Sequence, residues 1–137
     1  TVKNVPTIKP GDPLKGNRTV ALGDSGFSID SSVGSLTNWT SPDTWFTWSF
    51  KVAEPGEYGI EISQASLSAE PSEFEVYLAG KQFTGRSQQT KDLKTFAPVK
   101  LEGTAKLNAN YVYTVVLKAG DKVQPRMMDI EAVKLVQ

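Results

Sequence analysis

The sequence predicts an all-β domain, built as an antiparallel sandwich or barrel. Apolar residues alternate with polar ones along several short segments, which is the pattern of strands that are buried on one face. Turn residues separate these segments at spacings of about ten residues, so we expect roughly eight to ten strands. Apolar residues do not recur at helical spacing over the length of a helix, and the sequence contains no repeat at a fixed period.

The composition narrows the class of function. At 137 residues and 39% hydrophobic content, the chain can bury the core of one domain. It contains no cysteine and no histidine, which removes the thiol nucleophile and the commonest general base. Fifteen basic and fifteen acidic residues balance, and no basic cluster interleaves with aromatic residues, so nucleic acid is not an expected partner. No apolar run approaches a membrane span, so membrane insertion is not expected either.

The first part of the chain predicts an arm followed by a hairpin and a long loop. Residues 1–16 carry three prolines and three lysines without a sustained period, which indicates a Pro-rich linker or an N-terminal arm laid along the surface. Residues 17–137 form the predicted β-sandwich module. Within it, 20–22 and 27–29 alternate around a Gly-rich break and predict a hairpin. Residues 30–44 form a polar loop that carries Trp39, and loops longer than about 12 residues are often functional.

The segment from Trp45 to Val52 is the strongest strand. Phe46 and Trp48 share one face with the following alternate residues, so we expect Trp48 in the core, while Trp45 lies on the opposite face. A turn at 54–56 contains Pro and Gly, and alternation resumes from Tyr58. These two strands are predicted to pair in one antiparallel sheet.

The remaining strands follow at regular spacing. The alternating segment 74–78 and residues 82–86 flank Ala79-Gly80-Lys81 and predict a second hairpin. Pro98 marks a bulge or an edge within 96–101, and short turns bracket a strand at 105–107. Strands are expected at 111–117 and 128–135. The step of three between Ile130 and Val133 breaks period two and predicts a bulge near Glu131.

The order of these features resembles a known group of domains. The motifs are W-x-F-x-V, P-G-x-Y-x-I, F-x-V-x-L-x-G, the TKDLKTF segment at 90–96, Y-x-Y-x-V-x-L after an Asn turn, and a closing D-I-x-x-V-K-L. In this order they resemble β-jelly-roll carbohydrate-binding modules, which are galactose-binding-domain-like folds akin to families 6 and 35. Such modules are appended to secreted bacterial glycoside hydrolases, fucosidases and sulfatases. The resemblance covers about residues 18 to 136.

The resemblance implies a jelly-roll fold and an accessory role. It implies a non-catalytic module of a carbohydrate-active protein that is secreted, periplasmic or at the cell surface. The implied partners are a glycan or the catalytic domain of a larger protein. Because the chain begins with Thr, we expect that an export signal was removed or that the piece was cut from a longer protein.

The sequence departs from the pattern of these modules at three places. Leu93 stands where a tryptophan usually stacks on a pyranose ring, and residues 125–128 replace an asparagine of the last loop. The Glu-x-Glu pair that helps to hold a structural calcium is replaced at 18–20, although Asp129 matches the Asp of the closing strand. Calcium is the one cofactor that the resemblance implies, and with the Glu-x-Glu pair replaced only Asp129 matches a ligand of that site.

Sugar recognition requires flat aromatic faces and a few planar polar side chains. Trp39 and Trp45 are the best aromatic candidates, and an equal alternative is that either one covers the end of the core. The predicted polar partners are Arg86, Gln88, Asp92 and Arg126. Solvated loop, or an ion pair worth under about 1 kcal/mol, is the simpler interpretation of these four.

Two other functions stay open at this point. A structural accessory domain that binds no sugar is favoured by Leu93 and by the Pro-rich arm, and it predicts an exposed apolar patch. A small hydrolase is least favoured, because Ser25 in GDSG precedes no helical pattern and has no histidine to serve as its base.

Overall fold

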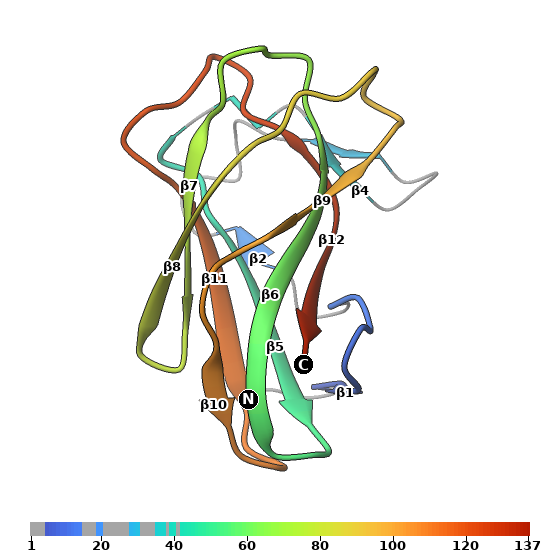
Figure 1. Ribbon diagram of the computed structural model, residues 1–137, viewed down its shortest axis with the longest axis vertical. Coiled ribbons are helices and arrows are strands. Elements are labelled where there is room, and N and C mark those ends of the chain that lie inside the picture. Colours follow the sequence, from blue (N-terminus) through green and yellow to red (C-terminus); the bar gives the residue numbers. More distant parts are fainter. Residues whose placement is uncertain (1–4, 15–18, 21–27, 31–34, 38, 41) are drawn as a thin grey trace.

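The protein is a sandwich of two β-sheets (Figure 1). The computed structural model describes residues 5–14, 19–20, 28–30, 35–37, 39–40 and 42–137. The first six-stranded sheet has the order β1-β5-β11-β7-β8, with β2 also paired to β5. The second has the order β10-β6-β12-β4-β3, with β9 also paired to β6. All pairs are antiparallel except β1 with β5, so the predicted antiparallel sandwich is confirmed.

The strands have the following bounds. The first sheet contains β1 (Thr7–Ile8), β2 (Thr19–Val20), β5 (Phe46–Val52), β7 (Glu73–Leu78), β8 (Lys81–Arg86) and β11 (Tyr113–Ala119). The second contains β3 (Ser28–Asp30), β4 (Ser35–Thr37), β6 (Gly56–Ala65), β9 (Ala97–Lys100), β10 (Ala105–Leu107) and β12 (Asp129–Val136). Among the residues that the structure describes, no helix is long and apolar enough to cross a membrane.

The core lies between the inner faces of the two sheets. Along β5 the side chains alternate strictly between buried and half-buried, as the sequence predicts. Trp48 is buried as expected, and Phe46 and Phe50 have no exposed surface. Burying one such side chain contributes roughly 1.5–3 kcal/mol, so the alternation fixes which face of β5 turns inward.

The hairpin formed by β7 and β8 is confirmed. Leu78 pairs with Lys81, so only Ala79 and Gly80 form the loop. Both have positive φ, 52° and 78°, which is the backbone of a type I′ turn. This turn matches the twist of two paired strands, so the hairpin is determined by residues that are close in the sequence.

Two other predicted pairings are wrong. β5 belongs to the first sheet and β6 to the second, so they face each other across the core instead of pairing. The predicted hairpin near residues 20–29 is also wrong, because β2 pairs with β5 whereas β3 pairs with β4; residues 21–27 lie outside the described ones. Two amphipathic strands joined by a short turn can pair as a hairpin in one sheet, or they can lie in two sheets that face each other. Both arrangements bury the apolar face of each strand, so the alternation does not distinguish them.

Several finer expectations have clear outcomes. The register shift between Ile130 and Ala132 confirms the bulge at Glu131. Pro98 lies in β9, which pairs with β6 alone and is therefore an edge strand. Tyr111 is 62% exposed and precedes β11, so the strand expected from 111 begins two residues later. The long loop expected at 30–44 contains β4; residues 31–34, 38 and 41 lie outside the described part.

Residues 5–14 run along both sheets. The Lys51 amide donates to the Pro6 carbonyl, and β1 continues beside β5. Further on, the Leu14 amide donates to the Val133 carbonyl in β12 of the other sheet. Ile8 and Leu14 are 5% and 6% exposed, so this segment adds apolar surface to the core. Residues 15–18 lie outside the described part, and the boundary between arm and module at residue 16 stays a prediction.

Candidate functional site

The structure divides the predicted site residues among three places. Trp39 lies in the core. Trp45 and Arg86 lie on the face of the first sheet that is turned away from the core, which we call the outer face. Gln88 and Asp92 lie in the loop 87–96, and Arg126 lies in the loop 120–128. These two loops and the loop 66–72 gather at the upper end in Figure 1, and we call the three loops the rim. The six residues therefore do not form one site.

Trp39 cannot offer its ring to a ligand, because none of its surface is exposed. Its ring packs edge-on against Phe46, with centroids 5.0 Å apart. Its carbonyl accepts a hydrogen bond from the Met127 amide at 2.9 Å. The chain passes from β4 in one sheet to β5 in the other at this point, so Trp39 closes the end of the core beneath the rim. Of the two interpretations of Trp39, the structure supports the core residue.

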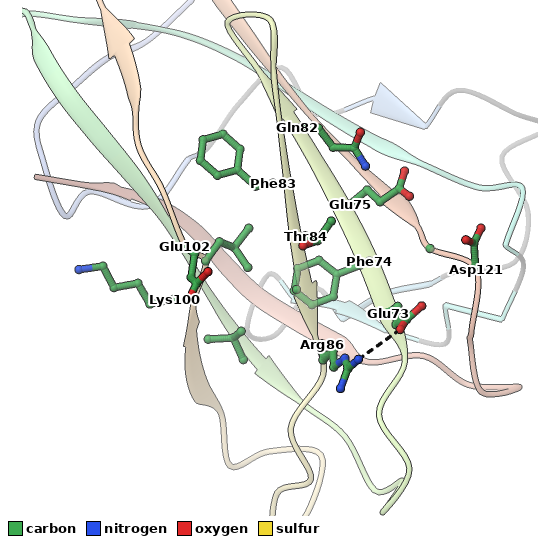
Figure 2. A pocket seen from close by; sticks show the side chains of 14 residues that line it. Glu73, Phe74, Glu75, Gln82, Phe83, Thr84, Arg86, Lys100, Glu102 and Asp121 are labelled. Carbon is green, nitrogen blue, oxygen red and sulfur yellow. Dashed lines mark ion pairs between the residues drawn. The ribbon is translucent and has the colours of Figure 1, made fainter.

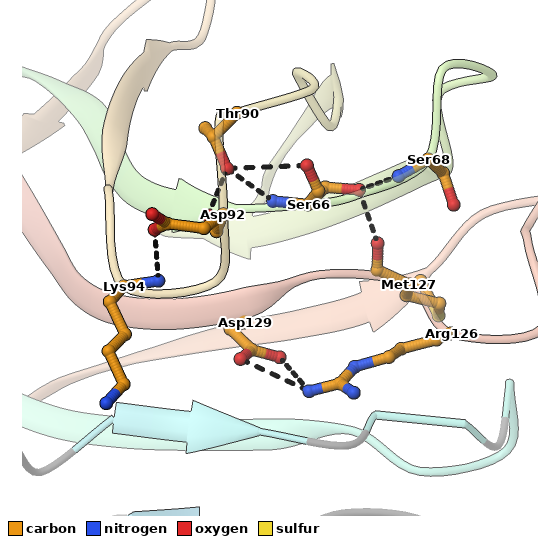
Figure 3. A network of polar contacts seen from close by, with 8 residues as sticks. All are labelled: Ser66, Ser68, Thr90, Asp92, Lys94, Arg126, Met127 and Asp129. Atoms are coloured by element: carbon orange, nitrogen blue, oxygen red, sulfur yellow. Dashed lines mark hydrogen bonds and ion pairs between the residues drawn. The ribbon is translucent and has the colours of Figure 1, made fainter.

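Asp92 folds its own loop (Figure 3). Its carboxylate accepts hydrogen bonds from the amides of Lys94 and Thr95, at 2.9 and 2.7 Å. The bond from the Lys94 amide is the main reason that the pKa of Asp92 is lowered, and the bonds from Thr95 act in the same direction. Thr90 joins this turn to the neighbouring loop, because its hydroxyl contacts the Asp92 carbonyl and accepts from the Ser66 amide. These contacts shape the loop.

Gln88 is held through its backbone. Its amide donates to the Oε1 atom of Gln64 at 3.2 Å, and the Gln64 side chain is fully buried beneath the rim. The side chain of Gln88 itself is exposed. Leu67 is the only rim residue among the large exposed hydrophobic side chains of the described residues, and Phe96, at the end of the loop 87–96, is half-buried.

Asp129 pairs with Arg126 instead of facing a cluster of oxygen ligands. The Nη2 atom of Arg126 lies 3.2 and 3.4 Å from the two carboxylate oxygens of Asp129, which is only 2% exposed (Figure 3). Within the described ranges, no group of three or more acidic side chains gathers as a metal ligand set. A guanidinium already occupies the carboxylate, so these residues do not fit a calcium site.

The outer face of the first sheet carries an aromatic cluster, of which the sequence analysis predicted only Trp45 as a site residue. It consists of Trp45, Glu75, Tyr77 and Lys118, which we call the platform. The Lys118 ammonium lies 5.5 Å from the centroid of the Trp45 ring and 5.8 Å from that of Tyr77. All four side chains are half-buried. Trp45 directly precedes β5, Lys118 lies on β11, and Glu75 and Tyr77 lie on β7; β11 lies between β5 and β7.

On the platform, Tyr77 and Glu75 are hydrogen-bonded to each other, whereas the Lys118 ammonium lies beside the aromatic rings. The Tyr77 hydroxyl donates to Oε1 of Glu75 at 2.6 Å, and this bond is the main cause of the raised pKa of Tyr77. Among the described residues no carboxylate forms an ion pair with Lys118, which rests between the two rings. The platform therefore combines two aromatic rings, a carboxylate and an unpaired cation on one surface.

The alternation of β7 is the signal that could have found these residues. Phe74, Val76 and Leu78 point inward, so Glu75 and Tyr77 must point outward. The alternation does not tell which strand lies beside β7, and Lys118 on β11 was therefore not connected with Trp45.

Arg86 lies on the same outer face, at the edge of the sheet. Its guanidinium is 3.6 Å from the Glu73 carboxylate and 70% exposed (Figure 2). A groove of about 880 Å³ surrounds this edge. It is lined by Glu73, Phe74, Glu75, Gln82, Phe83, Thr84, Gly85, Arg86, Val99, Lys100, Leu101, Glu102, Gly120 and Asp121.

Residues 13–137 match the family model that is described as "Domain of unknown function (DUF5077)". The chain belongs to this family. No curated protein matches the chain. The match covers every strand from β2 to β12 and begins after β1.

Solved structures of carbohydrate-binding modules have the same fold as this family member. A family 35 module from Clostridium thermocellum has a TM-score of 0.62 at 11% identity, over 88% of each chain. A family 35 module from Cellvibrio japonicus Abf62 has a TM-score of 0.64 at 13% identity, over 88% of this chain and 94% of its own. A third, a family 35 module in complex with a glucuronic acid containing disaccharide, has a TM-score of 0.63 at 12% identity, over 95% and 91%. The predicted jelly-roll fold is confirmed.

Proposed function

We propose that this domain is a non-catalytic glycan-binding module of a secreted or surface carbohydrate-active protein, and that it binds through the platform. The observation that carries the proposal is the pair of half-buried rings, Trp45 and Tyr77, held beside Glu75 and Lys118 on an open sheet face. This replaces the predicted pair of tryptophans, because Trp39 is buried.

The platform meets the physical requirements of sugar recognition. The C–H faces of a pyranose pack against aromatic rings, and such contacts are worth about 0.5–1.5 kcal/mol beyond the buried area. Glu75 offers a planar acceptor and Lys118 a donor for hydroxyl groups at the same place. Gln82 on β8 lies directly opposite Tyr77 and adds an amide. With only two rings on an open surface, we expect weak binding of an extended glycan.

The fold shared with family 35 modules supports a glycan over other ligands. One of those modules is described as a complex with a glucuronic acid containing disaccharide. Arg86 extends the proposed surface toward the sheet edge. Gln88, Asp92 and Arg126 stay predicted contacts at the rim, and attachment to a catalytic domain belongs to the same proposal.

A glycan-array screen of the domain, followed by titration of the best hit, tests the proposal. Trp45→Ala and Tyr77→Ala should each weaken binding about tenfold or more, since 1.4 kcal/mol corresponds to one decade. Tyr111→Ala is the matched control, because Tyr111 is exposed in the β10–β11 loop away from the platform. Equal affinity of all three variants would refute the platform as the site. Silence on the array, with and without calcium, would favour the structural accessory domain.

A further inference from the structure

β8 is the edge strand of the first sheet, and half of its backbone groups point away from the protein. Because the β7–β8 loop has two residues, Leu78 and Lys81 form a hydrogen-bonded pair, and bonded pairs alternate along the hairpin. Phe83 and Gly85 therefore bond to β7. The bond from the Ser87 amide to the Ser72 carbonyl continues the same alternation.

The residues between them carry the free groups. Gln82, Thr84 and Arg86 direct their N–H and C=O groups to the open side, and among the described strands only β7 pairs with β8. All three residues are exposed. No proline and no bulge interrupts this edge, and the charged residues Lys81 and Arg86 at its two ends are its protection against pairing.

The groove around this edge is acidic. Glu73, Glu75 and Asp121 line it on one side and Glu102 on another, against Arg86 and Lys100 as the basic groups (Figure 2). Arg86 is already paired with Glu73. The floor includes the apolar side chains of Phe74, Phe83 and Leu101.

We propose that the β8 edge accepts an extended, basic segment of a partner polypeptide by strand addition. The added strand would bond to the backbone of Gln82, Thr84 and Arg86 and continue the first sheet by one strand. Its lysine or arginine side chains reach the carboxylates of the groove. The exposed N–H and C=O groups of β8 alternate at the residue spacing of an extended polypeptide, so a peptide backbone can pair with them. A glycan has no backbone donors and acceptors at this spacing.

A second copy of this chain is a poor occupant of the same edge. Antiparallel pairing of two β8 strands about Thr84 would bring the two acidic grooves together. The residues that would face each other directly, Gln82 with Arg86 and Thr84 with Thr84, carry no like charges, but the carboxylates of the neighbouring segments would approach and repel one another. The charge of the groove therefore selects a basic partner over self-association.

The experiment uses a fluorescein-labelled octapeptide of alternating lysine and valine and the 137-residue chain, with binding followed by fluorescence anisotropy. The control peptides carry N-methyl groups on alternate residues, which removes one edge of backbone donors, or glutamate in place of lysine. We expect saturable binding of the lysine peptide and at least tenfold weaker binding of both controls.

Amide hydrogen exchange locates the contact. In the complex the amides of Gln82, Thr84 and Arg86 should exchange at least tenfold more slowly, while those of Phe83 and Gly85 stay protected throughout. Thr84→Pro removes one free donor and leaves the bonds to β7 intact, because this amide points outward. It should abolish the protection and weaken binding at least tenfold, and Thr84→Val should bind like the original chain.

Three results would overturn the proposal. The first is absence of binding at millimolar peptide. The second is binding that Thr84→Pro or N-methylation leaves unchanged, with no new protection in β8. The third is a dimer of the free chain in sedimentation that Thr84→Pro dissociates, because the occupant of the edge would then be a second copy.

Discussion

The rim and the platform both contain polar side chains, but those of the rim bond to neighbouring loop residues, whereas the platform has a lysine without an ion pair among the described residues. In the rim, Asp92 caps its own turn, Gln64 anchors the backbone of Gln88, and Arg126 neutralises Asp129. On the platform, Lys118 has no ion-pair partner among the described residues, and both rings remain partly open.

The difference shows how to separate structural from functional polar residues. A polar group whose bonds are satisfied by its own chain stabilises that chain, and recruiting it for a ligand costs the bond it already has. A half-exposed ring or charge without such a partner can bind a ligand at little cost. The rim residues therefore hold the loops together, and this contrast is the reason that we propose the platform as the binding surface.

The largest expected effect separates the two predicted tryptophans by stability. Trp39→Ala should lower the free energy of unfolding by about 3–5 kcal/mol, because it empties a fully buried site beneath the rim. Trp45→Ala should cost about 1 kcal/mol or less, since its ring is partly in water already. Urea denaturation of both variants measures the difference. Equal losses would mean that Trp45 is a core residue and that the platform is part of the packing.

A smaller effect is expected from the buried amide that anchors the rim. Gln64→Leu should cost about 1–3 kcal/mol, because the Gln88 amide and the Ala97 carbonyl lose a buried partner. The matched change on the outer face, Gln82→Leu, should stay within about 0.5 kcal/mol. Thermal unfolding of the pair checks this, and faster amide exchange at Gln88 should accompany the first change alone. If Gln82→Leu is the more costly, the contrast between rim and outer face is wrong.

The smallest effect concerns the pH dependence of the 92–95 turn. An aspartate in an unfolded chain has a pKa of about 3.9, and the amides of Lys94 and Thr95 lower the pKa of Asp92 in the folded state. The carboxylate therefore stabilises the turn above about pH 4, and this contribution is lost as the pH falls through the folded pKa. Side-chain carboxyl NMR should show the lowered pKa, and the Lys94 and Thr95 amide shifts should follow the same titration. In Asp92→Asn that titration should disappear; its persistence would show that another group controls the turn.

The sequence predicted much of the fold because the information is local. The β7–β8 hairpin is specified by two turn residues, the bulge at Glu131 by one broken step, and the inner face of β5 by strict alternation. The site was predicted less well. Trp45 was correctly placed on the face opposite the core set, but Tyr77 and Lys118 were missed, and of the two equal interpretations of Trp39 the structure has the core residue.

The sequence by itself determined the longer strands after Trp45, which face of each is buried, and the β7–β8 turn, because alternation and turn chemistry depend on neighbouring residues. Only the tertiary structure decided which strands lie side by side. It separated β5 from β6, placed β11 between β5 and β7, and left the outer edge of β8 open. The physical reason is that the hydrophobic effect is non-directional: any segment that covers the apolar face of a strand stabilises the fold. Which segment covers it depends on side-chain packing between residues that are distant in the sequence. The platform and the acidic groove follow from that choice.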